Sequence, residues 1–475
     1  MENFVQDAIS EPVSPGGQFL SNSVLSLSVI AVLETEVPVD DSQAMSLLRT
    51  VFLPINPRFS SIIVTNEDGE QRWKRVEVRV EDHVNVPVFP AGMAPEFYDK
   101  CLDDYLSKIA MENLPQSRPL WEIHIIKYPT SHAAGNVIFK LHHSLGDGFS
   151  LMGALLSCLQ RADNPSLPLT FPSFQLHANK DGKNFSMRRT LHQIFSTVYN
   201  TASAFSSSIL KSCSAEDDKT PIRSGQHGVV EFLPVGIETV TFSLDHIKQI
   251  KSQLGVTLND VITGTIFLGT RLYMETLSPG SGSAKSSSLV LLNTRVFAGY
   301  KSIEEMVKPN AELPWGNHCA FLTIPLPKLR DAGAENPLQF VFKARQIIKR
   351  KRLSSFAVYL TAKYLQLVSK FRGAQGASKY IHGTMMNTSM AVTNVMGPVE
   401  QMAIASHPVK GLYFVVTGAP QSLVVGVISY AGKLRVALLV EKDFIDPRKL
   451  KSHIEHAFDL IFKAACCSRT SPLEN

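Results

Sequence analysis

Residues 142–148, with the sequence HHSLGDG, join an apolar run to a helical pattern. The run at 137–141 (VIFKL) has the length and composition of a buried strand. After the motif, leucines at positions 151, 155 and 159 recur at the spacing of one helical face. Asp147 stands where that helix would begin, a place that suits a carboxylate because the helix dipole is positive there. The motif is therefore predicted to be a polar loop between a strand and a helix.

The motif, which Gly148 completes, offers a histidine base with an acid nearby. A neutral imidazole, with an ordinary pKa of about 6.5, can accept a proton at cellular pH. Neighbouring residues of a strand point to opposite faces, and His143 rather than His142 adjoins the loop, so His143 is the predicted base. Asp147 either orients this imidazole or turns away and holds the loop through a cation. Arg295, at the end of the strand-like run 289–295, is the predicted cation.

Other chemistries find less support in the sequence. His142, His143 and Asp147 could offer ligands to a metal, but adjacent histidines on a strand diverge and no further His or Cys cluster completes a site. A pair of hydrogen-bonded structural histidines is the remaining alternative. The sequence lacks the G-x-S-x-G of serine hydrolases and the glycine patterns of phosphate and dinucleotide loops. We therefore expect acid–base chemistry without a metal or a cofactor.

The chain is long enough for two domains, since hydrophobic cores stop growing near roughly 250–300 residues. Strand-like and helix-like runs alternate over residues 1–175 and again over 229–467, which favours an α/β fold. Residues 176–228, rich in Ser and charge, are predicted to be a linker, and 468–475 a disordered tail. Two local strand pairings are predicted: 121–126 beside 137–141, and a hairpin of 423–430 with 434–440 that turns at Ala431-Gly432.

Two stretches have the character of surface-binding segments. In the linker, apolar residues from Leu191 to Ile209 recur at helical spacing and predict an amphipathic helix, which either lies in a membrane surface or packs on a domain. Residues 336–399 contain ten Lys and Arg but no Asp or Glu, although the net charge of the chain is only +5. Such a segment attracts ligand phosphates or an anionic membrane, unless acidic groups elsewhere in the fold neutralise it.

The sequence predicts neither secretion nor a membrane span. The N-terminal Met-Glu-Asn has no basic region, so no secretory signal is expected. No uninterrupted apolar stretch reaches the roughly 18 residues that a spanning helix needs. The six cysteines show no metal-ligand spacing and are expected to be reduced.

Several short blocks, spread over nearly the whole chain, accompany the histidine motif. They are 57–61 (PRFSS), 118–122 (RPLWE), 259–261 (NDV), 293–295 (NTR), 316–317 (GN) and 394–398 (NVMGP). Together with the H-H-x-x-x-D-G pattern of 142–148, this set resembles the plant wax ester synthase/diacylglycerol acyltransferase family. Met396 stands where that family usually has proline, a departure that touches a turn rather than the chemistry.

The resemblance implies a fold and a reaction. The fold is two domains like chloramphenicol acetyltransferase, each a mixed β-sheet with flanking helices, with the active site at their interface. The reaction moves a fatty acyl group from acyl-CoA to a long-chain alcohol to give a wax ester, with diacylglycerol as a further acceptor that gives triacylglycerol. No metal, prosthetic group or nucleic acid is implied. The expected location is the cytosolic face of the endoplasmic reticulum membrane, or the plasma membrane.

The same resemblance extends the expected site into the second domain. His143 would act as the general base, with His142 and Asp147 as its support. The tetrahedral oxyanion needs hydrogen-bond donors, and Asn259 is the candidate donor. Asp260 is expected to hold structure, and Arg295 is a further possible partner.

Two alternative functions stay open. Soluble plant acyltransferases of the BAHD group act on specialised metabolites and share H-x-x-x-D, but they carry D-F-G-W-G near the end of the chain. The nearest strings here are 443–446 (DFID) and 315–316 (WG), and neither matches. The other alternative is a catalytically silent lipid-binding protein on the same scaffold, against which the intact His143 and Asp147 argue.

Overall fold

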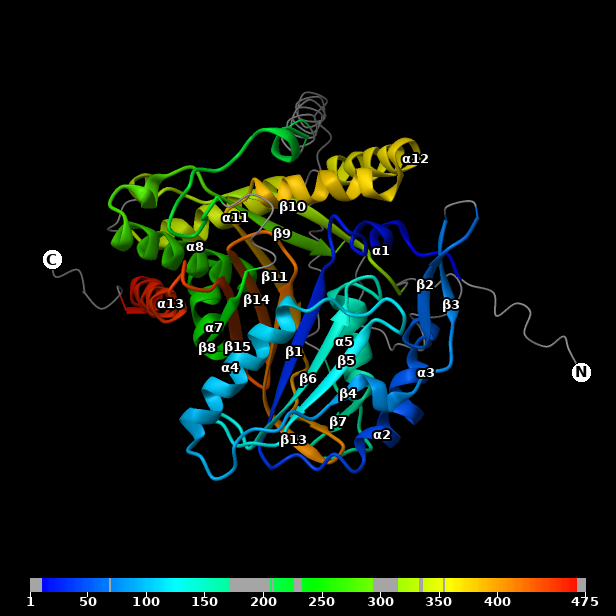
Figure 1. Cartoon of the computed structure of the whole chain (residues 1–475). Helices are drawn as coiled ribbons and strands as arrows, with labels where there is room; N and C mark the ends of the chain where they lie inside the picture. The colour runs from blue at the N-terminus through cyan, green and yellow to red at the C-terminus, as the bar shows by residue number, and fades with distance from the viewer. Residues whose placement is uncertain are drawn as a thin grey trace, which may run out of the picture.

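Two large β-sheets with flanking helices, together with a two-stranded sheet, make up the described structure (Figure 1). The computed structural model describes residues 11–67, 70–170, 206, 209–225, 233–293, 315–332, 336–352 and 355–467. Both sheets contain parallel and antiparallel pairs. The predicted α/β class with mixed sheets is therefore confirmed. No helix in these described ranges has the length and apolar character needed to cross a membrane.

The first sheet has the strand order β4-β5-β6-β1-β13-β12-β7. Every residue of β1, β5 and β6 is buried, because this sheet is covered on both faces. The predicted pairing of 121–126 with 137–141 is confirmed, since Trp121 faces Leu141 in the β5–β6 register. The strands are β1 (Ser28–Thr35), β4 (Val84–Asn85), β5 (Trp121–Ile126), β6 (Gly135–His142), β7 (Leu159–Arg161), β12 (Met402–Ile404) and β13 (His407–Thr417).

The second sheet has the order β10-β9-β11-β14-β15-β8. The predicted hairpin is confirmed as β14 and β15, and its turn residues Ala431 and Gly432 have φ values of 45° and 74°. Two consecutive positive φ values are typical of the tight turn whose twist matches that of the paired strands. The strands are β8 (Val235–Ser243), β9 (Ser287–Asn293), β10 (Cys319–Pro325), β11 (Met390–Met396), β14 (Leu423–Tyr430) and β15 (Lys433–Glu441); β2 (Ser61–Thr65) and β3 (Gln71–Arg75) pair separately.

Helix α8 (Leu258–Leu277) is the centre of the helical layer on the second sheet (Figure 1). A Cβ on Gly264 would lie 2.8 Å from Val341 Cα, and one on Gly269 would lie 2.6 Å from Ile454 Cα. These glycines therefore let α8 approach α11 and α13 closely. The other helices are α1 (Pro15–Phe19), α2 (Ala44–Leu47), α3 (Leu53–Ile55), α4 (Pro95–Met111), α5 (Gly148–Ser157), α7 (Leu244–Leu254), α10 (Leu329–Ala332), α11 (Leu338–Arg352), α12 (Ser355–Met386) and α13 (Pro447–Phe462).

The chain returns from the second half to complete the first sheet. Strand β13 pairs along β1, with Thr417 opposite Ser28. Arg435 of β15 forms a mostly buried ion pair with Glu34 of β1 and lies 5.1 Å from the centre of the Tyr413 ring. The predicted division into 1–175 and 229–467 therefore does not coincide with the division into sheets, since residues 402–417 belong to the first sheet.

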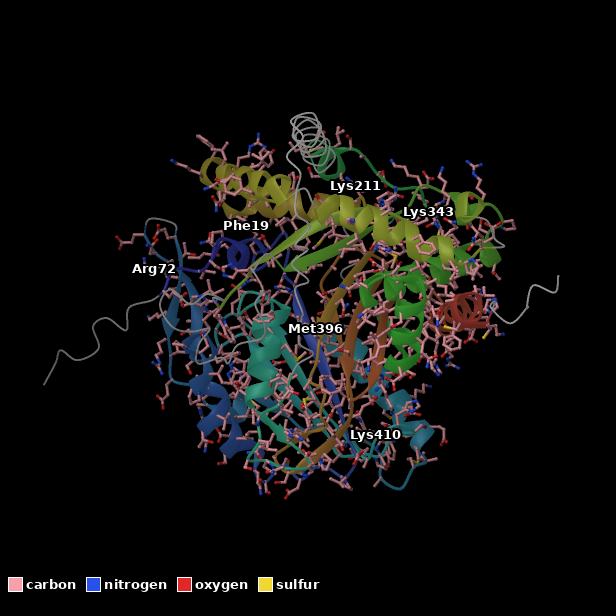
Figure 2. All side chains as sticks on the ribbon, turned by 180° about the vertical axis from the view of Figure 1, so that it is seen from behind. Phe19, Arg72, Lys211, Lys343, Met396 and Lys410 are labelled. Carbon is pink, nitrogen blue, oxygen red and sulfur yellow. The ribbon has the colours of Figure 1, made fainter. Side chains whose placement is uncertain are left out.

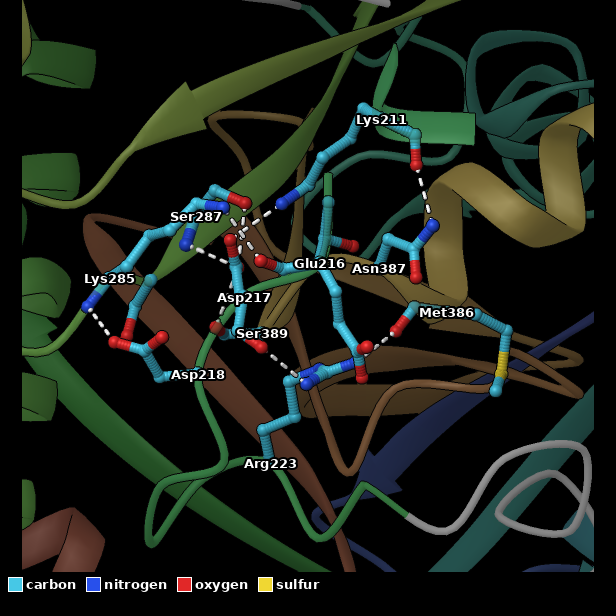
Figure 3. Close-up of polar contacts among 12 residues, drawn as sticks. Lys211, Glu216, Asp217, Asp218, Arg223, Lys285, Ser287, Met386, Asn387 and Ser389 are labelled. Atoms are coloured by element: carbon cyan, nitrogen blue, oxygen red, sulfur yellow. Dashed lines mark hydrogen bonds and ion pairs between the residues drawn. The ribbon is translucent and has the colours of Figure 1, made fainter. Parts of the chain in front are cut away.

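The described end of the linker is fastened to the second sheet by buried charges (Figure 3). Lys211 Nζ lies 2.5 Å from Asp217 Oδ1, while Asp217 Oδ2 accepts hydrogen bonds from Ser287 N (2.6 Å) and Ser389 Oγ (2.7 Å). Burial of this pair is tolerated because its charges are matched and hydrogen-bonded. We call this group the linker anchor. The predicted amphipathic helix lies almost wholly outside the described residues, and the tail 468–475 lies outside them entirely.

Candidate active site

The histidine motif begins as β6 ends, and its first histidine is held on both ring nitrogens. Ser144 N donates to His142 Nδ1 at 3.1 Å, so the other nitrogen, Nε2, carries the proton and donates to Ser26 Oγ at 3.1 Å. Burial lowers the pKa of His142 to about 3, helped by the neighbouring His143 and Lys140. His142 is therefore a neutral structural group that shapes the loop.

Asn317 fixes the tautomer of His143. Asn317 Nδ2 donates to the backbone oxygen of His143 at 2.8 Å, and this assigns the other amide atom, Oδ1, as an acceptor. Oδ1 lies 3.0 Å from His143 Nδ1. Nδ1 therefore carries the proton and donates it to this bond. The remaining ring nitrogen, Nε2, then has the lone pair that a general base needs.

The environment of His143 keeps the imidazole neutral. The residue is 3 % exposed, and among the residues that the structure describes none hydrogen-bonds Nε2. Burial lowers the pKa of His143 from its ordinary value of 6.5, although the charge of Asp147 and the bond to Asn317 both act to raise it. At neutral pH the imidazole is thus ready to accept a proton from a bound hydroxyl.

Asp147 fastens two backbone segments together. Its Oδ1 accepts from Ser150 N at 3.1 Å and caps α5, while its Oδ2 accepts from His318 N at 2.8 Å. This geometry favours the loop-clamp role, with a backbone N–H of the second half as a partner. The predicted partner, Arg295, lies outside the described residues. The Asp147 charge still reaches His143, since it raises the pKa of that imidazole.

Residues 315–318 (WGNH) form the second half of the site. Trp315 Nε1 donates to Leu145 O at 2.8 Å, and Gly316 exchanges two 3.1 Å hydrogen bonds with Ser150 Oγ. Gly316 has a φ of 128°, a conformation that L side chains rarely adopt, so glycine suits this turn. Because this segment precedes β10 of the second sheet while His143 follows β6 of the first, residues from both sheets build the site.

The sequence marked Gly316-Asn317 as a block but gave neither residue a role. The sequence therefore did not predict that Asn317 binds the His143 ring. The available signal was a glycine next to an amide side chain in the second half of the chain, and that signal does not say which histidine the amide meets.

The N-terminal blocks 57–61 and 118–122 contact the loop of the histidine motif. Arg58 Nη1 donates to Leu145 O at 3.4 Å, and Arg58 Nη2 pairs with Glu11 at 2.7 Å. Phe59 O accepts from Trp121 Nε1 at 2.9 Å. These blocks therefore fix the backbone of the motif, and their described hydrogen bonds to it involve backbone atoms of Leu145 and His142 rather than the His143 ring.

Asn259 and Asp260 lie at the start of α8. Asp260 forms a capping box with Thr257, in which Thr257 N donates to Asp260 Oδ2 at 2.8 Å, so its role at this helix end is structural. Asn259 Oδ1 accepts from Asn394 Nδ2 at 2.5 Å. The next residue, Val395, lies within 3.1 Å of where a Cβ on Gly148 would stand. Asn259 is thus linked to the motif through β11, and its part in oxyanion binding stays a prediction.

Replacing Asp147 with alanine should destabilise the protein by about 2–4 kcal/mol, because α5 loses its cap and the partly buried N–H of His318 loses an acceptor. Asp147→Asn keeps one acceptor and should lose about half as much. Urea unfolding followed by circular dichroism measures both. Asp163→Ala, which removes an exposed carboxylate paired with Arg161, is the control and should leave the midpoint almost unchanged. Equal midpoints for Asp147→Ala and the unaltered chain would contradict the clamp.

In the described part of the chain, no group of three His, Cys, Asp or Glu side chains is arranged to hold a metal ion. The expectation of acid–base chemistry without a metal stays a prediction. What the geometry does provide is a buried imidazole with one nitrogen anchored and the other presented.

Comparison with known proteins covers both halves of this arrangement. The model of the wax ester synthase/diacylglycerol acyltransferase catalytic domain matches residues 56–262, and that of the WS/DGAT C-terminal domain matches 315–462. Wax ester synthase/diacylglycerol acyltransferase 2 of Arabidopsis thaliana is 30% identical over 472 residues, with 96% of each chain covered. The two matched ranges include the histidine motif and residues 315–318.

Solved structures show the same fold. The wax ester synthase/diacylglycerol acyltransferase from Marinobacter aquaeolei superposes with a TM-score of 0.58 at 14% identity, covering 96% of this chain and 100% of that one. The first condensation domain of the calcium-dependent antibiotic synthetase gives a TM-score of 0.55 at 12% identity, with 96% of each chain covered. The mixed α/β fold that the family resemblance implied is confirmed, and the chain belongs to the wax ester synthase/diacylglycerol acyltransferase family of acyltransferases.

Proposed function

We propose that the chain transfers a fatty acyl group from acyl-CoA to the hydroxyl of a long-chain alcohol, with diacylglycerol as a second acceptor. The observation that carries this proposal is the hydrogen bond between His143 Nδ1 and Asn317 Oδ1, because it leaves Nε2 of a buried histidine as a base. The substrates named here are those that the names of the relatives suggest: wax ester synthase and diacylglycerol acyltransferase.

The proposed reaction moves one proton through His143. Nε2 takes the proton of the acceptor hydroxyl while its oxygen attacks the thioester carbonyl carbon. The tetrahedral intermediate then expels the CoA sulfur as the carbon–sulfur bond breaks, and the imidazolium returns the proton to that thiolate. The products are an ester and free CoA, and the sequence of steps uses no metal or cofactor.

The intermediate carries a negative oxygen that hydrogen-bond donors must stabilise. Asn259 is the proposed donor, since Asn394 engages its amide oxygen and leaves its amide nitrogen to face another acceptor. The bond also orients the amide, because Asn394 Nδ2 is the donor in it. The burial of His143 serves the same reaction, because bulk water near Nε2 would compete with the lipid hydroxyl for the thioester.

The proposed location is the cytosolic face of the endoplasmic reticulum membrane, with the plasma membrane as a second site. Both lipid substrates partition into a bilayer, and both ester products are uncharged and apolar. A site that opens toward a membrane surface would exchange them without passing through water. The acid-free basic stretch 336–399 supports this location.

A product assay tests the proposal. Purified protein receives labelled palmitoyl-CoA with hexadecanol, dioleoylglycerol or a phenolic alcohol, and the esters are separated by thin-layer chromatography. A labelled wax ester, with or without triacylglycerol, is the expected result. Labelling of the phenolic ester alone would replace the proposal with the specialised-metabolite alternative. Binding of palmitoyl-CoA without any ester would identify a silent lipid-binding protein.

A further inference from the structure

Helix α12 consists of two segments that meet at Gly373. Gly373 has φ 69° and ψ 174°, values that lie outside the helical region, and the positive φ suits glycine. Beyond it the helix is locked to the protein: Ala377, Ile381 and Met385 are buried in the core, and Ser378 Oγ donates to Phe19 O at 2.8 Å. The second segment is therefore anchored in the core, and the first segment, residues 355–372, contacts it through Leu365 and through the Tyr364 ring, whose centre lies 5.5 Å from that of Tyr380.

The first segment exposes an apolar ridge. Tyr359, Leu367 and Phe371 are 53%, 53% and 77% exposed. Together with Lys363 they occupy positions four residues apart, so the four side chains follow one helical face. The Nζ of Lys363 lies 5.6 Å from the centre of the Tyr359 ring. Lys370, also exposed, flanks the same face. We call these five residues the α12 ridge.

The charged side chains that α11 and α12 carry have one sign. Between Asn336 and Val399 the chain contains no acidic residue, so neither α11 nor α12 can neutralise its own lysines and arginines. Figure 2 shows α12, and α11 with Lys343, along one edge of the molecule, with side chains pointing outward from it. Large aromatic and aliphatic side chains beside lysines, on helices that carry no acidic residue, suit an anionic apolar boundary.

We propose that the α12 ridge docks on an anionic lipid bilayer, with Leu367 and Phe371 entering the acyl boundary and Lys363 and Lys370 facing the headgroups. The competing reading, a site for the phosphates of CoA, needs converging polar donors, and it leaves Phe371 and Leu367 without a purpose. A bilayer accounts for both kinds of side chain. The inference rests on the proposed membrane location but not on acyl transfer.

Sedimentation with vesicles tests the α12 ridge. The full chain is mixed with vesicles of phosphatidylcholine and phosphatidylserine at about 3:1, or of phosphatidylcholine alone, without substrate. Binding should require phosphatidylserine and weaken with salt. Lys363→Gln with Lys370→Gln should weaken it about thirtyfold, since each lysine near such a surface contributes about fivefold. Leu367→Ser with Phe371→Ser should weaken it on the order of fiftyfold, because less apolar area leaves water.

Matched controls distinguish vesicle binding by the α12 ridge from non-specific adsorption and from acyl transfer. Val88→Ser alters an apolar side chain that is 89% exposed on the other half of the molecule, and it should bind vesicles like the unaltered chain. His143→Ala should bind equally well, so failed docking and failed acyl transfer remain distinguishable. Unchanged vesicle binding by both ridge variants would overturn the proposal. So would an equal loss in Val88→Ser, or a ridge variant whose only defect is a raised KM for palmitoyl-CoA in detergent micelles.

Discussion

His143→Ala is expected to lower kcat by about 10²–10⁴-fold, the range that general-base assistance supplies. The reason is geometric: Asn317 occupies Nδ1, and Nε2 is the nitrogen left to take the proton of the acceptor hydroxyl. KM for acyl-CoA should change far less, because the imidazole acts on the acceptor rather than on CoA. Rates measured over a range of palmitoyl-CoA concentrations, at saturating hexadecanol, give kcat and the KM for palmitoyl-CoA separately.

The pH dependence of the unaltered enzyme also tests the assignment of His143 as the general base. The pKa of His143 lies below its ordinary 6.5, so the neutral, active form persists at neutral pH. Activity should fall only as the pH decreases through that lowered pKa, since protonation then removes the base. His132→Ala, which removes an exposed histidine from the turn between β5 and β6, is the control and should retain full activity. Turnover by His143→Ala within a few fold of normal would exclude it as the base.

The parts of the structure that sequence patterns predicted are local. The neighbouring strands at 121–126 and 137–141 and the hairpin at Ala431-Gly432 depend on contacts between residues close in the chain. His143 was chosen over His142 by strand alternation. Both ring nitrogens of His142 are engaged in hydrogen bonds, and the choice of His143 as the base stays a prediction that its variants test.

The parts that escaped prediction depend on contacts between distant residues. Strand β13 joins the first sheet from the second half of the chain, and no periodicity within 402–417 distinguishes one sheet from the other. Asn317 meets His143 across 174 residues. A single amide side chain belongs to no sequence pattern that predicts its partner, whereas the spacing of apolar residues predicts a strand or a helix. The backbone N–H of His318 is likewise a distant partner of Asp147 that no sequence pattern marked, while the predicted cation partner, Arg295, lies outside the described residues and stays a prediction.

Asn317→Ala is expected to lower kcat by about 10²–10³-fold with little change in KM, because the His143 ring loses the acceptor that fixes its tautomer. A free imidazole divides between two tautomers and several orientations, and only one of these presents an unprotonated Nε2 to the substrate. Asn317→Asp should keep the acceptor while adding a negative charge beside Nδ1. That charge favours the protonated ring and raises the pKa of His143, so the acidic limb of the pH–rate profile should move to higher pH.

A matched variant separates positioning from mere stability. Asn387 also donates its amide nitrogen to a backbone oxygen, that of Lys211 at 2.8 Å, but it does so at the linker anchor. Asn387→Ala and Asn317→Ala should each lose about 1–2 kcal/mol of stability, since each loses partly buried hydrogen bonding. The alanine variant at 317 should in addition lose turnover, and the aspartate variant there should shift the pH profile. If Asn387→Ala slowed the reaction as much, or if Asn317→Asp left the acidic limb in place, Asn317 would be a structural residue. Another group would then fix the tautomer of His143.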